Sequence, residues 1–252
     1  MTIPNLQTKV FNTRLIMDST INPAIIWKEP ILYTDSCYES LKVKFTGAST
    51  IKRNFSQCYQ DMFVLTMLDG KKLGQFLEIG CGSPFYCNNT VLLEKLFGWD
   101  GISIDINKEI TENFSKYRSS KVINSDATIL NYNKLLKETD YDYLQIDCDP
   151  AIISYKVLSS IPFESHRFAV ITFEHDFYAD EKSGVREQSR EFLYSQGYKL
   201  VVNNISPDER SSFEDWWVHP ELVKNEIIIK MHCLSEVPKK ADYYMFGKCH
   251  GD

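Results

Sequence analysis

The sequence lacks the long apolar run that a membrane-spanning helix needs. No stretch approaches the ~18 apolar residues required to cross a bilayer. The first residues, Met-Thr-Ile-Pro-Asn-Leu-Gln, also lack a basic segment followed by an apolar one. We therefore expect neither a membrane span nor a secretory signal.

The cysteines lack any regular spacing. Their number is odd, and they form neither a C-x-x-C pair nor the Cys/His spacing of a zinc site. In a chain of 252 residues this is typical of free thiols in a reducing compartment, so we expect a cytoplasmic protein without disulfides. The seven cysteines are Cys37, Cys58, Cys81, Cys87, Cys148, Cys233 and Cys249.

Basic residues are too few to give the chain a positive charge. Lys and Arg together number 28 against 34 Asp and Glu, so the net charge is −6. An acidic chain repels a phosphate backbone, so we expect no general nucleic-acid binding, although a local basic patch stays open. The 43% hydrophobic and 25% charged residues are ordinary for a globular protein and exclude disorder of the whole chain.

Short apolar segments alternate with helical patterns from residue 75 onward. Such alternation is typical of βαβ units, which build a parallel sheet covered by helices on both faces. We therefore predict one α/β domain with the layers of an αβα sandwich. The predicted strands are 75–80, 101–105, 121–124, 141–147, 167–173 and 198–205, with 225–231 as a candidate last strand. The predicted helices are 57–68, 89–98, 107–118, 130–138, 151–160 and 183–196.

Residues 1–50 have a mixed composition in which Pro4, Pro23 and Pro30 prevent any long helix. We expect them to form a lead-in to a domain that comprises residues 51–252. Two alternatives stay open for this segment, a lid over a substrate pocket and a contact with a partner subunit in a homodimer.

Glycines and a carboxylate follow the first two strands, at the edge where open α/β sheets bind ligands. Gly80 and Gly82 allow the backbone to turn tightly and approach a ligand, but the third glycine of the dinucleotide fingerprint is missing. Asp105 lies 25 residues beyond Gly80 and suits the two hydroxyls of a ribose. The alternative for Asp105 is a helix N-cap.

The third strand is followed by residues that suit an adenine ring. Asp126 can accept a hydrogen bond from an adenine amino group, and the small Ala127 leaves room for the ring, although Asp126 is also a candidate N-cap. Glu78, on the first strand, repels phosphate and suits a sulfonium or amino group. The three loops thus predict an adenosine site without a pyrophosphate clamp, and they resemble those of class I S-adenosylmethionine-dependent methyltransferases.

Three ordered segments narrow this resemblance to the FkbM-type methyltransferases, over roughly residues 55–205. They begin at Ser56-Gln57, at Gly74-Gln75 and at Asn88-Asn89-Thr90. The sequence departs from the family pattern at Tyr59, Cys81 and Asn88, and after the fourth strand. The resemblance implies a mostly parallel seven-stranded sheet, S-adenosylmethionine as cofactor, and methyl transfer to a hydroxyl group. The cofactor residues that it implies are Gln60, Glu78, Gly80, Gly82, Asn89, Asp105, Ile106, Asp126 and Ala127.

Polar residues also follow the fourth and fifth strands, where we expect the acceptor. His175 is our candidate for the general base that removes the hydroxyl proton, with Asp147 to orient it. The resemblance implies a small-molecule sugar acceptor, either nucleotide-activated or linked to a glycan. The candidate acceptor-binding residues are Asp149, Asp176, Tyr178, Trp216 and Trp217, with 213–220 expected to be a loop.

Three alternatives remain open at the level of the sequence. Asp147, Asp149 and Asp176 offer oxygen ligands for Mg²⁺, and residues 146–155 look a little like a stretch of cation-dependent O-methyltransferases, with Pro150 in place of Lys. The same fold also serves non-catalytic binding proteins. An NAD-dependent oxidoreductase is disfavoured by the missing third glycine and by Glu78.

Overall fold

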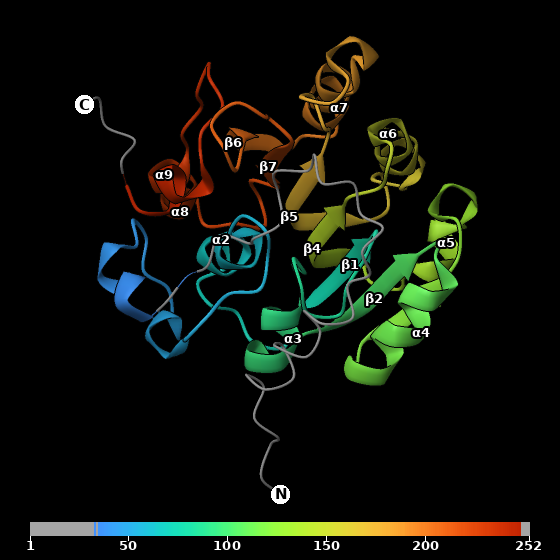
Figure 1. Cartoon of the computed structure of the whole chain (residues 1–252), viewed down its shortest axis with the longest axis horizontal. Coiled ribbons are helices and arrows are strands. Elements are labelled where there is room, and N and C mark those ends of the chain that lie inside the picture. The colour runs from blue at the N-terminus through green and yellow to red at the C-terminus, as the bar shows by residue number, and fades with distance from the viewer. Residues whose placement is uncertain (1–32, 34, 248–252) are drawn as a thin grey trace, which may run out of the picture.

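Seven strands form a single mixed sheet in the computed structural model, which describes residue 33 and residues 35–247 (Figure 1). The strands lie in the order β3-β2-β1-β4-β5-β7-β6. Only β7 runs antiparallel to its neighbours among the described strands. The predicted αβα sandwich with a mostly parallel seven-stranded sheet, a Rossmann-like fold, is therefore confirmed. The bounds are β1 (Gln75–Ile79), β2 (Asp100–Asp105), β3 (Lys121–Asn124), β4 (Asp140–Ile146), β5 (Arg167–Glu174), β6 (Lys199–Ile205) and β7 (Glu214–Val218).

Helices cover both faces of this sheet. One face packs against α2, α3, α8 and α9, and the other packs against α6 and α7 (Figure 1). Parallel strands buried on both faces need continuous apolar runs, which is why the sequence predicted β4 and β5 closely. The α-helices are α2 (Gln60–Met67), α3 (Val91–Phe97), α4 (Lys108–Tyr117), α5 (Tyr132–Leu135), α6 (Ala151–Ser160), α7 (Val185–Ser195), α8 (Asn225–Met231) and α9 (Ala241–Met245). The 3-10 helices are η1 (Asp35–Ser40), η2 (Ala48–Thr50), η3 (Ala127–Ile129) and η4 (Glu181–Ser183).

The seventh strand is not the predicted one. Residues 225–231, predicted as a strand, form α8, because burial of Ile227, Ile228 and Met231 with Ile229 exposed follows a helical period. The predicted loop 213–220 instead contains β7, whose five residues are all buried. The strand begins with the two carboxylates Glu214 and Asp215, so its sequence lacks the continuous apolar run that predicts a buried strand.

The structure also differs from the prediction in the segment 130–138 and in part of the predicted lead-in. The predicted helix 130–138 is reduced to η3 and the single turn of α5. Leu41, Phe45 and Ala48, within the predicted lead-in, are buried in the core beside α2. The proposed lid function of residues 1–50 falls mostly on residues 1–32, which lie outside the described residues. The six described cysteines are free thiols, and no described helix is long and apolar enough to span a bilayer.

Candidate functional site

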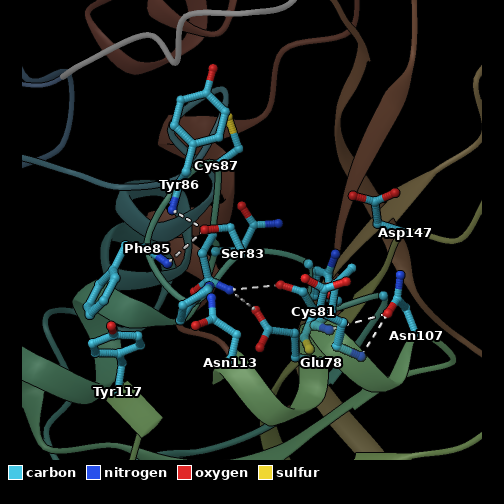
Figure 2. A pocket seen from close by; sticks show the side chains of 18 of the residues that line it. Glu78, Cys81, Ser83, Phe85, Tyr86, Cys87, Asn107, Asn113, Tyr117 and Asp147 are labelled. Atoms are coloured by element: carbon cyan, nitrogen blue, oxygen red, sulfur yellow. Dashed lines mark hydrogen bonds between the residues drawn. The ribbon is translucent and has the colours of Figure 1, made fainter. Parts of the chain in front are cut away.

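Two adjoining cavities lie at the carboxyl ends of β1, β2 and β4. The larger, of about 880 Å³, extends between segment 81–89 and α4 (Figure 2). The smaller, of about 630 Å³, lies over the ends of β2 and β3. Gly80, Gly82 and Asp147 line both cavities. The carboxyl-end edge of the sheet, where the sequence predicted the ligand site, therefore contains both cavities. The turn at Gly80 and Gly82 lies between them.

The turn after β1 depends on glycine at two positions. Gly80 has a φ of +78° and Gly82 a φ of +55°, both in the left-handed region that L-residues avoid. A Cβ on Gly80 would lie only 1.6 Å from the backbone oxygen of Asp147, whereas one on Gly82 would meet nothing within 4 Å. Gly80 thus permits the close approach of β1 and β4, and Gly82 leaves open space above the turn.

Asp105 fixes the turn from the neighbouring strand. Its Oδ2 accepts a hydrogen bond from the Gly82 N–H at 3.1 Å, and its Oδ1 accepts one from the Asn107 N–H at 2.8 Å. The N-cap of α4 is Asn107, so the helix-cap alternative for Asp105 is wrong. Asp105 lines the smaller cavity beside Ile106, whose side chain is 71% exposed. Asp105 and Ile106 thus present a carboxylate and an apolar side chain to the same cavity.

Asp126 and Ala127 complete the smaller cavity, as predicted from their position after β3. Asp126 also caps η3, because its Oδ1 accepts from the Thr128 N–H at 2.8 Å and from the Thr128 hydroxyl at 2.7 Å. These bonds lower the pKa of Asp126. The cap role and a ligand role are compatible, since the cap uses only one of the two carboxylate oxygens.

Glu78 lies beneath the larger cavity in a buried hydrogen-bond network. Its carboxylate accepts from Asn88 Nδ2 at 3.0 Å, Thr90 Oγ1 at 3.0 Å and Ser103 Oγ at 2.7 Å. Burial raises the pKa of Glu78, and the charge of Arg118 with these three hydrogen bonds opposes the rise. Glu78 therefore links β1 to the segment that forms the cavity wall.

Arg118 holds that wall from the far end of α4. Its fully buried guanidinium donates to Asn88 Oδ1 at 2.9 Å, Thr90 Oγ1 at 2.8 Å and the Pro84 carbonyl at 3.3 Å. It also donates to Glu94 Oε2 at 2.9 Å. Burial alone would raise the pKa of Glu94, but Arg118 and nearby donors lower it to about 2. One cation thus fastens segment 84–90 against α3 and α4.

We expect the Arg118→Met variant to lose about 3 kcal/mol of unfolding free energy, because it leaves the buried Glu94 carboxylate without its main partner. The measurement is urea unfolding at neutral pH. Arg167→Met is the control, since Arg167 pairs with Asp140 and Glu221 at the surface, where such pairs contribute less than about 1 kcal/mol. Equal losses in the two variants would contradict the role assigned to Arg118.

The two amide side chains among the predicted cofactor residues differ in position. Asn89 lines the larger cavity and is 6% exposed, and its Oδ1 is buried without a hydrogen-bond partner. Gln60 lines neither cavity, and its Oε1 accepts a hydrogen bond from the Cys58 N–H at 2.7 Å at the start of α2. Direct cofactor contact by Gln60 is thus not supported, whereas Asn89 retains a free acceptor in the cavity wall.

Asp147, Glu174 and Asp176 form a carboxyl cluster at the ends of β4 and β5. Glu174 shares hydrogen bonds with both aspartates. Burial is the largest cause that raises the pKa of each of the three groups, and the Asp176 charge contributes to the shift at Asp147. The pKa of Asp147 rises to about 7. The cluster therefore holds protons near neutral pH, beside the glycine turn.

The remaining predicted acceptor residues at this edge are distributed around the cluster. Asp149 is exposed and lines the smaller cavity. Tyr178 is 46% exposed, and burial together with the charges of Asp176 and Glu174 raises its pKa. Within the described part of the chain, no three Asp, Glu, His or Cys side chains are placed to hold a metal ion. The predicted Mg²⁺ site at Asp147, Asp149 and Asp176 is thus not supported.

The structure contradicts the prediction that His175 is the general base. The side chain is fully buried and lines neither cavity. Its Nδ1 accepts from the Phe177 N–H at 3.2 Å, and its Nε2 lies 3.5 Å from Asp215 Oδ1. Burial alone would raise the pKa of Asp215, but His175 and Arg190 hold it well below its usual range. His175 therefore faces a structural ion pair, not Asp147.

The prediction that Trp216 and Trp217 bind the acceptor is also wrong. Both side chains are fully buried on β7. Trp216 stacks on Phe63 of α2 with a centroid distance of 4.4 Å, and Trp217 packs edge-on against Tyr194 of α7. Because neighbouring residues of a strand point to opposite faces, the two rings fill the two core layers.

Sequence reasoning missed the residues that support the site from a distance. Asn88, which precedes the predicted Asn89, bonds both Glu78 and Arg118. In the sequence, only its departure from the family pattern could have indicated this role. Arg118 gave no local signal, because its partners lie 24 to 34 residues earlier in the chain. Gln145 was overlooked inside a strand; it lines the larger cavity, and its Oε1 is buried without a partner.

No protein-family model and no curated protein matches the chain. Among solved structures, an rRNA methylase from Streptococcus thermophilus is 11% identical with a TM-score of 0.45, covering 63% of this chain and 94% of that one. A TehB-like SAM-dependent methyltransferase from Corynebacterium glutamicum is 15% identical with a TM-score of 0.41, covering 64% and 88%. A SAM-dependent methyltransferase from Archaeoglobus fulgidus is 19% identical with a TM-score of 0.40, covering 69% and 84%. These values are too low to inform the substrate, and the function rests on the geometry of the site.

Proposed function

We propose that the chain is an S-adenosylmethionine-dependent O-methyltransferase that acts on a hydroxyl group of a small polar acceptor. The observation that carries the proposal is the placement of Asp105 in the smaller cavity, bonded to the glycine turn. A carboxylate at this point can accept hydrogen bonds from both hydroxyls of a ribose. Ile106, Asp126 and Ala127 lie around the same cavity and suit the adenine ring.

The larger cavity suits the amino-acid part of the cofactor. Asn89 contributes a buried oxygen without a partner, which is the acceptor that an ammonium group requires. Glu78 provides a negative charge below the same wall. Gly80 and Gly82 line both cavities, so one elongated molecule can pass over the turn from one cavity to the other.

Electrostatics disfavours the oxidoreductase alternative. Glu78, Asp105 and Asp147 surround the glycine turn, and a pyrophosphate placed there would meet three carboxyl groups. A sulfonium cation at the same place would be attracted to these carboxyl groups. The site therefore supports a positively charged nucleoside better than a dinucleotide.

Asp147 is the chain's own candidate for the proton acceptor. When bound, S-adenosylmethionine supplies an electrophilic methyl group. Asp147 lines both cavities beside the glycine turn, and a carboxyl group with a pKa of about 7 can receive a hydroxyl proton near neutral pH. In this proposal Asp147 replaces His175 as the base, and it accepts the proton directly.

A sugar acceptor is the finer form of the proposal. Hydroxyl-rich molecules need closely spaced acceptors and donors, and Asp149, Gln145 and the Asp147 carboxyl group offer these around the glycine turn. Trp216 and Trp217, which were also candidates for binding the acceptor, are fully buried and do not face the cavities.

Calorimetry with S-adenosylhomocysteine and, separately, with NAD tests the proposal. We expect binding of S-adenosylhomocysteine and none of NAD. Incubation with S-adenosylmethionine and a panel of free and nucleotide-activated sugars then tests for a mass gain of one methylene. Binding of NAD in place of S-adenosylhomocysteine would overturn the proposal, and cofactor binding without methyl transfer to any sugar would remove its sugar part.

Asp147 should make stability depend on pH in a characteristic direction. Its pKa is about 7 in the folded protein and near 3.8 when unfolded, so the folded state binds more protons between these values. Its contribution to stability is present below about pH 4 and is lost as the pH rises through about 7. We therefore expect Asp147→Asn to gain stability relative to wild type between mildly acidic and mildly alkaline pH, measured by urea unfolding. If the free energy of unfolding varied with pH in the same way in both proteins, the raised pKa of Asp147 would be contradicted.

A further inference from the structure

The larger cavity has room for more than the amino-acid part of the cofactor. Its volume of about 880 Å³ lies within the range of pockets that enclose a whole small molecule. Asp147, the candidate proton acceptor, lines this cavity, and Figure 2 shows it across the cavity from Phe85 and Tyr117. The space that the cofactor leaves can therefore hold the acceptor within reach of Asp147.

Gln145 lines the same cavity with a side-chain amide that has no partner in the described chain. The residue is 3% exposed, and its Oε1 is buried without a hydrogen bond. Its Nε2 likewise donates to no described residue. Native proteins satisfy nearly all buried polar groups. Gln145 is therefore placed for a ligand that the chain itself does not supply.

The neighbours of Gln145 explain why its amide stays unpaired and what lies beside it. Glu78 is in register with Gln145 across β1 and β4, but its carboxylate already accepts hydrogen bonds from three other side chains. Asp147 follows two residues after Gln145, and both line the larger cavity. Positions two apart along an extended segment are separated by about 7 Å. One six-membered ring can therefore contact both side chains.

A carboxamide needs a ligand that both donates and accepts hydrogen bonds. Its oxygen accepts and its nitrogen donates, side by side. An ammonium group would satisfy only the oxygen of Gln145, and a carboxylate or phosphate would satisfy only the nitrogen. Two neighbouring hydroxyl groups satisfy both atoms, because each hydroxyl can donate or accept.

The charges around the cavity disfavour an anionic acceptor. Among the described residues that line it, Lys116 is the only positively charged one, whereas four are acidic: Glu78, Glu109, Glu112 and Asp147. A phosphate placed here would be repelled by these carboxyl groups. The ligand that suits Gln145 is therefore a hydroxyl compound without phosphate.

We propose that Gln145 selects the acceptor, and that the acceptor is an uncharged sugar bound through two neighbouring hydroxyl groups. Gln145 Oε1 accepts from one hydroxyl, and its Nε2 donates to the other. A sugar ring carries hydroxyls around its rim, so a further hydroxyl of the same ring faces Asp147. Phosphorylated and nucleotide-activated sugars are disfavoured. This inference rests on the proposed function and narrows its substrate class.

Calorimetry on the protein saturated with S-adenosylhomocysteine tests the class of acceptor. Glucose, galactose and mannose are each titrated as the free sugar and as the 6-phosphate, at neutral pH and low salt. We expect at least one free sugar to bind, and to bind about tenfold or more tightly than its 6-phosphate.

The Gln145→Met variant, titrated with monodeoxy analogues of the sugar that binds, tests the role of Gln145. In wild type, removal of either of two neighbouring hydroxyls should weaken binding about tenfold. In Gln145→Met the intact sugar should already bind about tenfold more weakly, and the same two analogues should show little further loss, because both changes remove the same hydrogen bonds. Affinity for S-adenosylhomocysteine should be unchanged. Gln75→Met, at the exposed start of β1, is the matched control and should behave as wild type.

Four results would overturn the inference. They are no binding of any of the three free sugars, equal affinity for a free sugar and its 6-phosphate, the same losses with the deoxy analogues in Gln145→Met as in wild type, and a lower unfolding temperature of Gln145→Met. The last result would show a structural role, because replacing an unpartnered buried amide by a side chain of similar length should not cost stability. Wild-type protein that fails to bind S-adenosylhomocysteine would count against the proposed function itself, so the two failures are distinguishable.

Discussion

Replacing Gly80 by alanine is expected to abolish cofactor binding and to lower the free energy of unfolding by about 4 kcal/mol or more. The added Cβ would lie 1.6 Å from the Asp147 carbonyl oxygen and 2.7 Å from its carbonyl carbon. These are backbone atoms of β4, which cannot rotate away, so the ends of β1 and β4 must separate. Separation moves Asp147, which lines both cavities.

Gly82→Ala is the matched control for this variant. Gly82 has a similar positive φ of +55°, but a Cβ there meets nothing within 4 Å. Its cost in stability should be limited to the left-handed conformation, about 1–2 kcal/mol. Urea unfolding and calorimetry with S-adenosylhomocysteine measure the two effects. If Gly80→Ala proves as stable as Gly82→Ala, the tight contact between the strand ends is not what holds the site together.

Replacing Asp105 by alanine should weaken binding of S-adenosylhomocysteine about a hundredfold, or about 2.7 kcal/mol. The variant loses the carboxylate that is placed to accept from both ribose hydroxyls, and it also frees the Gly82 N–H from its partner. Asp105→Asn should weaken binding less, by about tenfold, because the amide retains one acceptor oxygen and presents N–H donors beside the Gly82 N–H.

Asp100→Asn is the control for the Asp105 variants. Asp100 begins the same strand at the opposite edge of the sheet, where it is exposed and accepts only from the Gly101 N–H at 2.8 Å among the bonds described. The same calorimetric titration should give wild-type affinity for this variant. Unchanged affinity in Asp105→Ala would falsify the ribose assignment and, with it, the proposed cofactor.

Much of the sheet was predictable because its central strands are buried on both faces. The segments Gln75–Ile79, Asp140–Ile146 and Arg167–Glu174 are mostly apolar, and each is followed by glycine or acidic residues at the ligand-binding edge. Gly80, Gly82, Asp105, Asp126 and Ala127 accordingly line the cavities, because each lies at or just after the carboxyl end of a strand.

The acceptor side was less predictable because side chains just beyond a strand end alternate in direction. His175 and Asp176 are adjacent in the sequence, yet one faces Asp215 and the other joins the carboxyl cluster. The strand β7 was missed for a related reason. Glu214 and Asp215 suggest a loop, but Asp215 is satisfied by Arg190, and burial raises the pKa of Glu214 to about 8 despite its bond with Trp216.

The sequence by itself determined the αβα architecture and the strand-end edge that holds the two cavities, because apolar runs and glycines directly after a strand are local signals. Only the tertiary structure decided which polar groups face that edge. Arg118 reaches the wall of the larger cavity from the end of α4, and Asp147 meets Glu174 across two strands. These contacts depend on register and on the face to which each side chain points, and neither is fixed until the strands pair.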